Sequence, residues 1–144
     1  MRVIMKKNGV SRNDYVRIFP MTKWLNLVIG GILGTLARYL LAGATYRVFG
    51  TEFPYGTLVV NLSGCFLIGL FAALADTKFL IGPNGRMLLM IGFCGAFTTF
   101  STYILESANL IRDGETLRAL MNVVGSVVLG FVAFRVGIFA GEAI

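Results

Sequence analysis

The chain is 144 residues long, the length of a single domain. Its hydrophobic fraction of 56% excludes intrinsic disorder and, together with a charged fraction of only 14%, argues against an ordinary soluble fold. The net charge of +6 would suggest nucleic acid as a partner of a soluble protein, but in so apolar a chain we attribute it to basic residues that face anionic lipid headgroups. We therefore expect an all-α protein of the lipid bilayer that does not bind nucleic acid.

Residues 1–20 differ from the rest of the chain because they are polar and basic. Their basic residues are Arg2, Lys6, Lys7, Arg12 and Arg17, against a single acid, Asp14. They contain no apolar segment with a nearby small-residue cleavage site, so they do not resemble a signal peptide. Met21 offers a second plausible start. We expect residues 1–20 to be either a non-essential basic extension or a lipid-binding tail, and we place the functional domain at residues 21–144.

The first apolar segment, residues 24–48, is long enough to cross a bilayer as a helix. Gly30 and Gly34 have the GxxxG spacing that lets membrane helices approach closely. Arg38 is the unusual residue, because it lies well inside the segment. Its side chain either reaches back to the headgroups or faces the interior of the assembly, where it would attract anions to a vestibule.

The second segment, residues 55–75, carries no charge but contains Asn61. An amide in hydrocarbon is costly unless it has a hydrogen-bond partner. Asn61 could therefore bond to a neighbouring helix, or it could donate to a permeating anion. The two interpretations have equal support from spacing alone. The Gly-Pro-Asn-Gly run at residues 82–85 then predicts a turn.

The third segment, residues 87–111, contains the unusual run from Gly92 to Tyr103. Its twelve positions hold two glycines, four hydroxyl side chains and four aromatics, and glycine and β-branched residues weaken a helix. Non-helical backbone is tolerated at membrane depth only where protein buries it or where it lines a wet cavity. We therefore expect a broken helix beside an ion path. Phe100 and Tyr103, three residues apart, would share a helix face, a spacing more often used for packing than for function.

The fourth segment, residues 117–139, completes a plan of four transmembrane helices and places Asn122 and Ser126 one turn apart. With residues 1–20 left out, the basic residues are nearly balanced across the membrane. One side has Lys23, Lys78, Arg86 and Arg135, and the other has Arg47, Arg112 and Arg118. The positive-inside rule therefore barely selects an orientation, which would permit insertion both ways and an antiparallel dimer of identical chains.

These features favour a channel or transporter, because polar groups lie at mid-membrane without catalytic machinery. An enzyme would need a nucleophile, a base or a metal cluster, and the sequence has no histidine to supply one. A small four-helix, dual-topology multidrug exporter is the alternative. It would need a carboxylate deep in a helix, whereas Asp76 and Glu106 lie at or near span ends. A scaffold subunit would have no use for the polar broken stretch.

Three motifs together resemble those of the Fluc (CrcB) family of fluoride channels. They are Gly30-Gly31-x-x-Gly34-x-x-x-Arg38-Tyr39, Pro54-x-Gly56-Thr57-Leu58-x-x-Asn61-x-x-Gly64 and Gly92-x-x-Gly95-x-x-Thr98-Thr99-Phe100-Ser101-Thr102-Tyr103. They occur in the order and at the spacing of that family, and with the four-span plan they cover residues 21–144. The resemblance implies passive, selective export of fluoride across the bacterial cytoplasmic (inner) membrane, which lowers its toxicity in the cytoplasm.

The resemblance also implies an assembly and a set of sites. The protein would be a multi-pass, dual-topology antiparallel homodimer with two fluoride pathways, and the broken third helices would cross at its centre. There the backbone carbonyls of Gly95 and Thr98 from both subunits would coordinate a structural sodium ion. The implied residues of the anion pathway are Arg38, Asn61, Phe100, Thr102, Tyr103 and Ser126. Tyr103 stands where the family usually has a second phenylalanine.

Overall fold

Four long helices form the protein in the computed structural model, which describes residues 21–144. They are α2 (Met21–Phe49), α3 (Tyr55–Asp76), a discontinuous third span (Pro83–Arg112) and α7 (Thr116–Ala143). All four are long and apolar enough to cross a membrane, and each of the four predicted spans lies inside an observed one. Residues 1–20, for which we predicted an extension or a tail, lie outside the described part of the chain.

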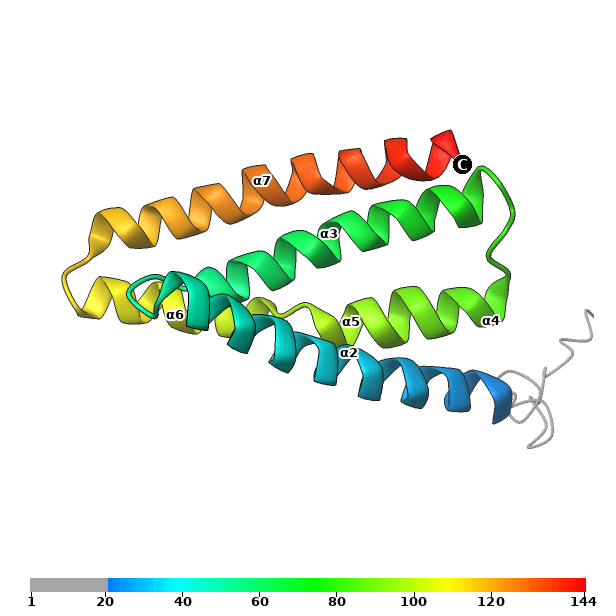
Figure 1. Cartoon of the computed structure of the whole chain (residues 1–144), viewed down its shortest axis with the longest axis horizontal. Helices are drawn as coiled ribbons and strands as arrows, with labels where there is room; N and C mark the ends of the chain where they lie inside the picture. The colour runs from blue at the N-terminus through cyan, green and yellow to red at the C-terminus, as the bar shows by residue number, and fades with distance from the viewer. Residues whose placement is uncertain (1–20) are drawn as a thin grey trace, which may run out of the picture.

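The helices run up and down, so that the start of α2 and the C-terminus lie at the same end of the molecule (Figure 1). Two pairs of helices make the most extensive contacts: α3 lies along α7, and α2 lies along the first half of the third span. Gly69 in α3 faces α7, where a β-carbon would overlap the carbonyl oxygen of Phe134. Gly137 in α7 faces the carbonyl oxygen of Phe66 in the same way. Small residues thus bring the two backbones into direct contact, as expected for helices packed in lipid.

The GxxxG pair in α2 makes the second close contact. A β-carbon on Gly30 would overlap the carbonyl oxygen of Leu88, and one on Gly34 would overlap that of Phe93. Both carbonyls belong to η1 (Arg86–Cys94), a π-helical segment of the third span that follows the single turn α4 (Pro83–Gly85). The predicted role of Gly30 and Gly34 in close helix packing is therefore confirmed, and it holds α2 against the segment that leads to the helix break.

The third span is broken, as predicted. After η1 come a short turn, α5 (Gly95–Phe97), and then two extended residues before α6 (Phe100–Arg112) begins (Figure 1). Thr98 has φ −84° and ψ 159°, and Thr99 has φ −148° and ψ 118°. Gly95, a weak helix former within the predicted run, is itself helical, with φ −63° and ψ −36°. The break thus lies at Thr98 and Thr99. It forms there because side chains, described below, accept the backbone N–H groups of Thr99 and Thr102.

Candidate ion pathway and cation site

The side chain of Asn61 bridges α3 and the helix break through two hydrogen bonds. The backbone N–H of Thr99 donates to Asn61 Oδ1 at 2.8 Å, and Asn61 Nδ2 donates to the carbonyl oxygen of Thr99 at 3.0 Å. Of the two interpretations of Asn61, the structure therefore contains the bond to a neighbouring helix. A primary amide has a second N–H on the same nitrogen. This second N–H is the group through which Asn61 would donate a hydrogen bond to an anion.

A second side chain caps the first turn of α6. Thr99 Oγ1 accepts a hydrogen bond from the backbone N–H of Thr102 at 3.3 Å and donates to Thr102 Oγ1 at 3.0 Å. Threonine is a good N-cap residue because its hydroxyl replaces a missing helical acceptor. The Ser and Thr hydroxyl groups of this run, which led us to predict a broken helix, therefore also help to start α6.

These bonds remove the usual donors from two backbone carbonyls. In a continuous α-helix, the N–H of Thr99 would donate to the carbonyl of Gly95, and the N–H of Thr102 would donate to that of Thr98. In this protein the two N–H groups donate to Asn61 Oδ1 and Thr99 Oγ1 instead. Neutral carbonyl oxygens without such donors suit a hard cation such as sodium. The chemistry at Gly95 and Thr98 thus fits the cation site that was predicted for them.

A cavity of about 320 Å³ lies beside the break, between α3 and the third span. Its lining includes Asn61, Gly95, Thr98 and Phe100. Phe100 is 74% exposed in the single chain, and its ring lies 5.6 Å from the ring of Tyr103, measured between centroids. The structure therefore brings the proposed cation ligands, the bridging amide and one predicted pathway aromatic to a single cavity.

A second cavity, of about 510 Å³, lies between α2, α3 and α6. Arg38 and Thr102, both predicted for the anion pathway, line it together with Thr99. Arg38 therefore faces a cavity in the bundle that it shares with hydroxyl groups of the third span, which favours the inward-facing interpretation of this arginine. The arginine and the hydroxyl donors would attract an anion to this cavity, whereas the Glu106 carboxylate, which also lines it, would repel one.

Tyr103 is buried, with 7% of its surface exposed, and its hydroxyl donates to the carbonyl oxygen of Val123 in α7 at 3.3 Å. Nearby, Asn122 Nδ2 donates to Ser107 Oγ at 2.9 Å, and Ser107 Oγ donates to the carbonyl of Tyr103 at 2.8 Å. These bonds connect α6 to α7. The hydroxyl of Tyr103 thus has a helix-packing partner, and Tyr103 lines neither of the two cavities described above.

Ser126 lies apart from the other predicted pathway residues. Its hydroxyl donates to Asn122 Oδ1 at 3.4 Å, and it lines a largely apolar groove of about 600 Å³ with Cys65 and Gly130. Within the described residues, the structure therefore groups Arg38 with Thr102, and Asn61 with Phe100, but it does not bring Ser126 to either cavity.

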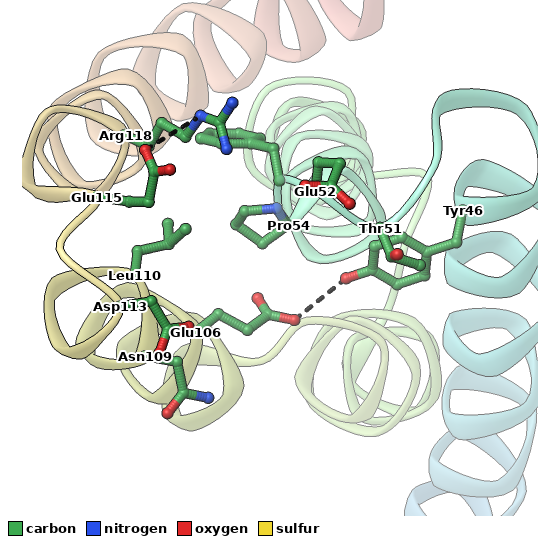
Figure 2. A pocket seen from close by; sticks show the side chains of 11 residues that line it. Tyr46, Thr51, Glu52, Pro54, Glu106, Asn109, Leu110, Asp113, Glu115 and Arg118 are labelled. Carbon is green, nitrogen blue, oxygen red and sulfur yellow. Dashed lines mark hydrogen bonds and ion pairs between the residues drawn. The ribbon is translucent and has the colours of Figure 1, made fainter.

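Glu106 is a polar residue of the interior that the sequence did not single out as a site. It lies within two turns of the end of the third span, as expected, but its carboxylate points into the bundle. Thr57 Oγ1 donates to Glu106 Oε1 at 2.8 Å. The hydroxyl of Tyr46 donates to the same oxygen at 3.1 Å (Figure 2). Its Oε2 is buried and, among residues 21–144, has no hydrogen-bond partner. The sequence signal was the one acid within the predicted third span.

Tyr46 and Glu106 also separate two spaces. Both line the cavity that contains Arg38, and both line a further cavity of about 510 Å³ at the end of the bundle. Figure 2 shows the acidic side chains of that end cavity around Glu106. They are Glu52, Asp113 and Glu115, the last paired with Arg118 at 3.5 Å. Across residues 21–144, no group of three or more His, Cys, Asp or Glu side chains is placed to hold a metal ion.

Comparison with known proteins identifies the family. Residues 25–138 match the model of the CrcB-like protein family, Camphor Resistance (CrcB). The chain belongs to the CrcB family. A relative from Maridesulfovibrio salexigens is 44% identical over 124 residues, which are 86% of this chain and 98% of that protein. Relatives from Opitutus terrae and Chlorobium luteolum are 46% and 47% identical, over 81% and 78% of this chain and 90% and 87% of theirs. All three relatives are named fluoride-specific ion channel FluC.

Proposed function

We propose that this protein is a fluoride-selective ion channel that exports fluoride passively across the bacterial cytoplasmic membrane and so lowers its toxicity. The observation that carries the proposal is the similarity to proteins named fluoride-specific ion channels, which extends over nearly their whole length. The four spans make it a multi-pass membrane protein. Channels of this name are not enzymes, and the relatives do not favour the alternative of a multidrug exporter.

The physical basis of fluoride passage is the replacement of its hydration shell. Fluoride is small and strongly hydrated, so hydroxyl and amide donors must approach it closely when water is lost. Arg38 and Thr102 supply a positive charge and a hydroxyl at one cavity, and Asn61 and Phe100 supply an N–H and a ring edge at the other. The edge of an aromatic ring is its positive rim and can face an anion without holding it tightly. Binding that is adequate but escapable is what conduction needs.

The cation of this channel would be a structural sodium ion held by the backbone carbonyls of Gly95 and Thr98. The support is the diversion of the Thr99 and Thr102 amides to side-chain acceptors. Gly95 is also exposed in the single chain, and a β-carbon on it would meet no atom within 4 Å. Gly95 and Thr98 supply two carbonyls from one chain. A second copy would complete the oxygen ligands that a hard cation requires.

That second copy would be antiparallel, giving a dual-topology homodimer. The near balance of basic residues across the membrane supports it, because neither orientation is strongly favoured. Exposed apolar side chains also line the outer faces of α2 and α7, where lipid or a partner subunit would cover them. Residues of one subunit, such as Ser126, would then contribute to a pathway that the single chain leaves incomplete.

The test is reconstitution of the purified full-length protein in liposomes loaded with fluoride or chloride, with efflux followed by ion-selective electrodes. We expect rapid fluoride efflux and little chloride efflux, with protein-free liposomes as the control. Absence of fluoride efflux, or chloride efflux at an equal rate, would contradict the proposal. Proton-coupled movement of an organic cation would instead support the multidrug exporter.

A further inference from the structure

The two extended residues at the break, Thr98 and Thr99, need partners because backbone polar groups without them are costly inside a membrane. Asn61 satisfies both polar groups of the Thr99 backbone at once, its N–H through Oδ1 at 2.8 Å and its C=O through Nδ2 at 3.0 Å. An asparagine side chain can do this because its amide carries a donor and an acceptor side by side. Aspartate could replace only the acceptor, and alanine neither group.

Helix α3 presents this amide at a fixed position. Gly64, one turn after Asn61, lies against the break so closely that a β-carbon on it would overlap the Thr98 methyl group. The contact places α3 directly against the extended residues. Asn61 is therefore held in register with Thr99 by backbone packing rather than by a flexible side chain alone.

A continuous helix is the competing conformation. The residues before the break are already helical, since Gly95 has φ −63° and ψ −36°. Only Thr98 and Thr99 would have to rotate for α5 to continue into α6. The N–H of Thr99 would then donate to the carbonyl of Gly95, which would no longer be available to a cation. The choice between the two conformations depends on which acceptor receives the Thr99 amide.

We propose that Asn61 is a positioning residue of the cation site. By accepting the Thr99 amide it leaves the Gly95 carbonyl free to bind a cation, and it thereby links that site to Phe100, which lines the same cavity beside the break. The inference rests on the proposed function for the identity of the cation. The effect of Asn61 on the Gly95 carbonyl can be measured without any cation.

The chain allows the Gly95 carbonyl to be observed directly. Only two glycines are followed by alanine, at Gly43-Ala44 and Gly95-Ala96. Full-length protein labelled with carbonyl-¹³C glycine and ¹⁵N alanine in detergent micelles therefore gives two signals in an HNCO spectrum. Gly43 lies within the unbroken helix α2 and serves as the internal reference. Replacing Ala44 by serine removes its signal and so assigns the pair.

In the wild type, we expect the Gly95 carbonyl to have the ¹³C chemical shift of a carbonyl without a hydrogen bond. This shift should change when N-methylglucamine in the buffer is replaced by sodium, whereas the shift of Gly43 should not. In Asn61→Ala the Gly95 signal should move toward the helical Gly43 value, and the apparent sodium affinity should weaken at least tenfold. Asn61→Asp keeps an acceptor for Thr99, so it should retain the wild-type carbonyl signal. Asn122→Ala is the matched control, because it removes another buried interhelical amide but should leave both signals and the affinity unchanged.

The outcomes separate this inference from the proposed function. An unchanged Gly95 signal in Asn61→Ala, or the same change in Asn122→Ala, would overturn the positioning role. If the wild-type Gly95 carbonyl does not respond to sodium, the proposed cation is wrong, whereas movement of that carbonyl in Asn61→Ala would still support the role of Asn61. If Asn61 acted only as an anion donor, Asn61→Ala would lose fluoride flux but keep the sodium response.

Discussion

Replacement of Gly34 by alanine should destabilise the protein by pushing α2 away from the segment that leads to the break. The added β-carbon would overlap the carbonyl oxygen of Phe93 and lie only 3.0 Å from the backbone nitrogen of Phe97. Both are backbone atoms and cannot rotate away, so the helices must separate. Overpacking of this kind costs about 1–3 kcal/mol. Alanine recovers up to about 1 kcal/mol through its higher helix propensity.

Because both crowded atoms belong to the backbone, we take the overpacking cost from the upper part of its range, about 2–3 kcal/mol, so the expected net loss is about 1–2 kcal/mol, or a fall in Tm of about 2–8 °C for a chain of this size. The measurement is thermal unfolding of the purified protein in detergent, followed by circular dichroism. Gly31→Ala is the matched control, because Gly31 lies on the same helix but a β-carbon there meets no atom within 4 Å. Its Tm should stay the same or rise. Equal Tm values for the two variants would refute the close approach of α2 as a source of stability.

Three further predictions concern the third span. Tyr103→Phe removes the hydrogen bond to Val123 and should cost about 0.5–1.5 kcal/mol in unfolding, while fluoride efflux from liposomes stays near the wild-type rate because the ring is kept. Phe100→Ile should greatly lower fluoride efflux, because it removes the ring edge beside the break; a near-normal rate would remove Phe100 from the pathway. Glu106→Ala should lower the free energy of unfolding by about 1–3 kcal/mol, because the buried Thr57 hydroxyl loses its acceptor. Glu106→Gln keeps an acceptor oxygen and should lower it less. The reverse order of the two variants in thermal unfolding would contradict this account.

The spans and the existence of a break could be predicted because both depend on local composition. Twenty or so apolar residues are enough to mark a transmembrane helix, and each predicted span falls inside an observed one. The run from Gly92 to Tyr103 combines weak helix formers with hydroxyl groups, and it contains the observed break. Its exact place could not be predicted, because it depends on Asn61, which is 38 residues away in sequence.

The contacts of Glu106 were hidden from sequence reasoning for the same reason. Its partners Tyr46 and Thr57 are 60 and 49 residues away, on two other helices. The sequence predicted that Glu106 lies near the end of the third span, and the structure places it within two turns of that end. The direction of the Glu106 side chain was not evident from the sequence. A side chain near a helix end can point toward water or toward neighbouring helices, and only the packing decides which.

Weak helix propensity alone does not explain the break. A glycine in a helix interior costs only about 1 kcal/mol relative to alanine, whereas each unsatisfied backbone group inside a membrane costs several kcal/mol. A chain with low helix propensity but no alternative hydrogen-bond partners would therefore remain helical at Thr98 and Thr99. The extended conformation is stable because Asn61 and the Thr99 hydroxyl replace the helical acceptors of the Thr99 and Thr102 amides. The same two replacements take the usual helical donors away from the carbonyls of Gly95 and Thr98, so the interactions that hold the helix open also create the candidate cation ligands.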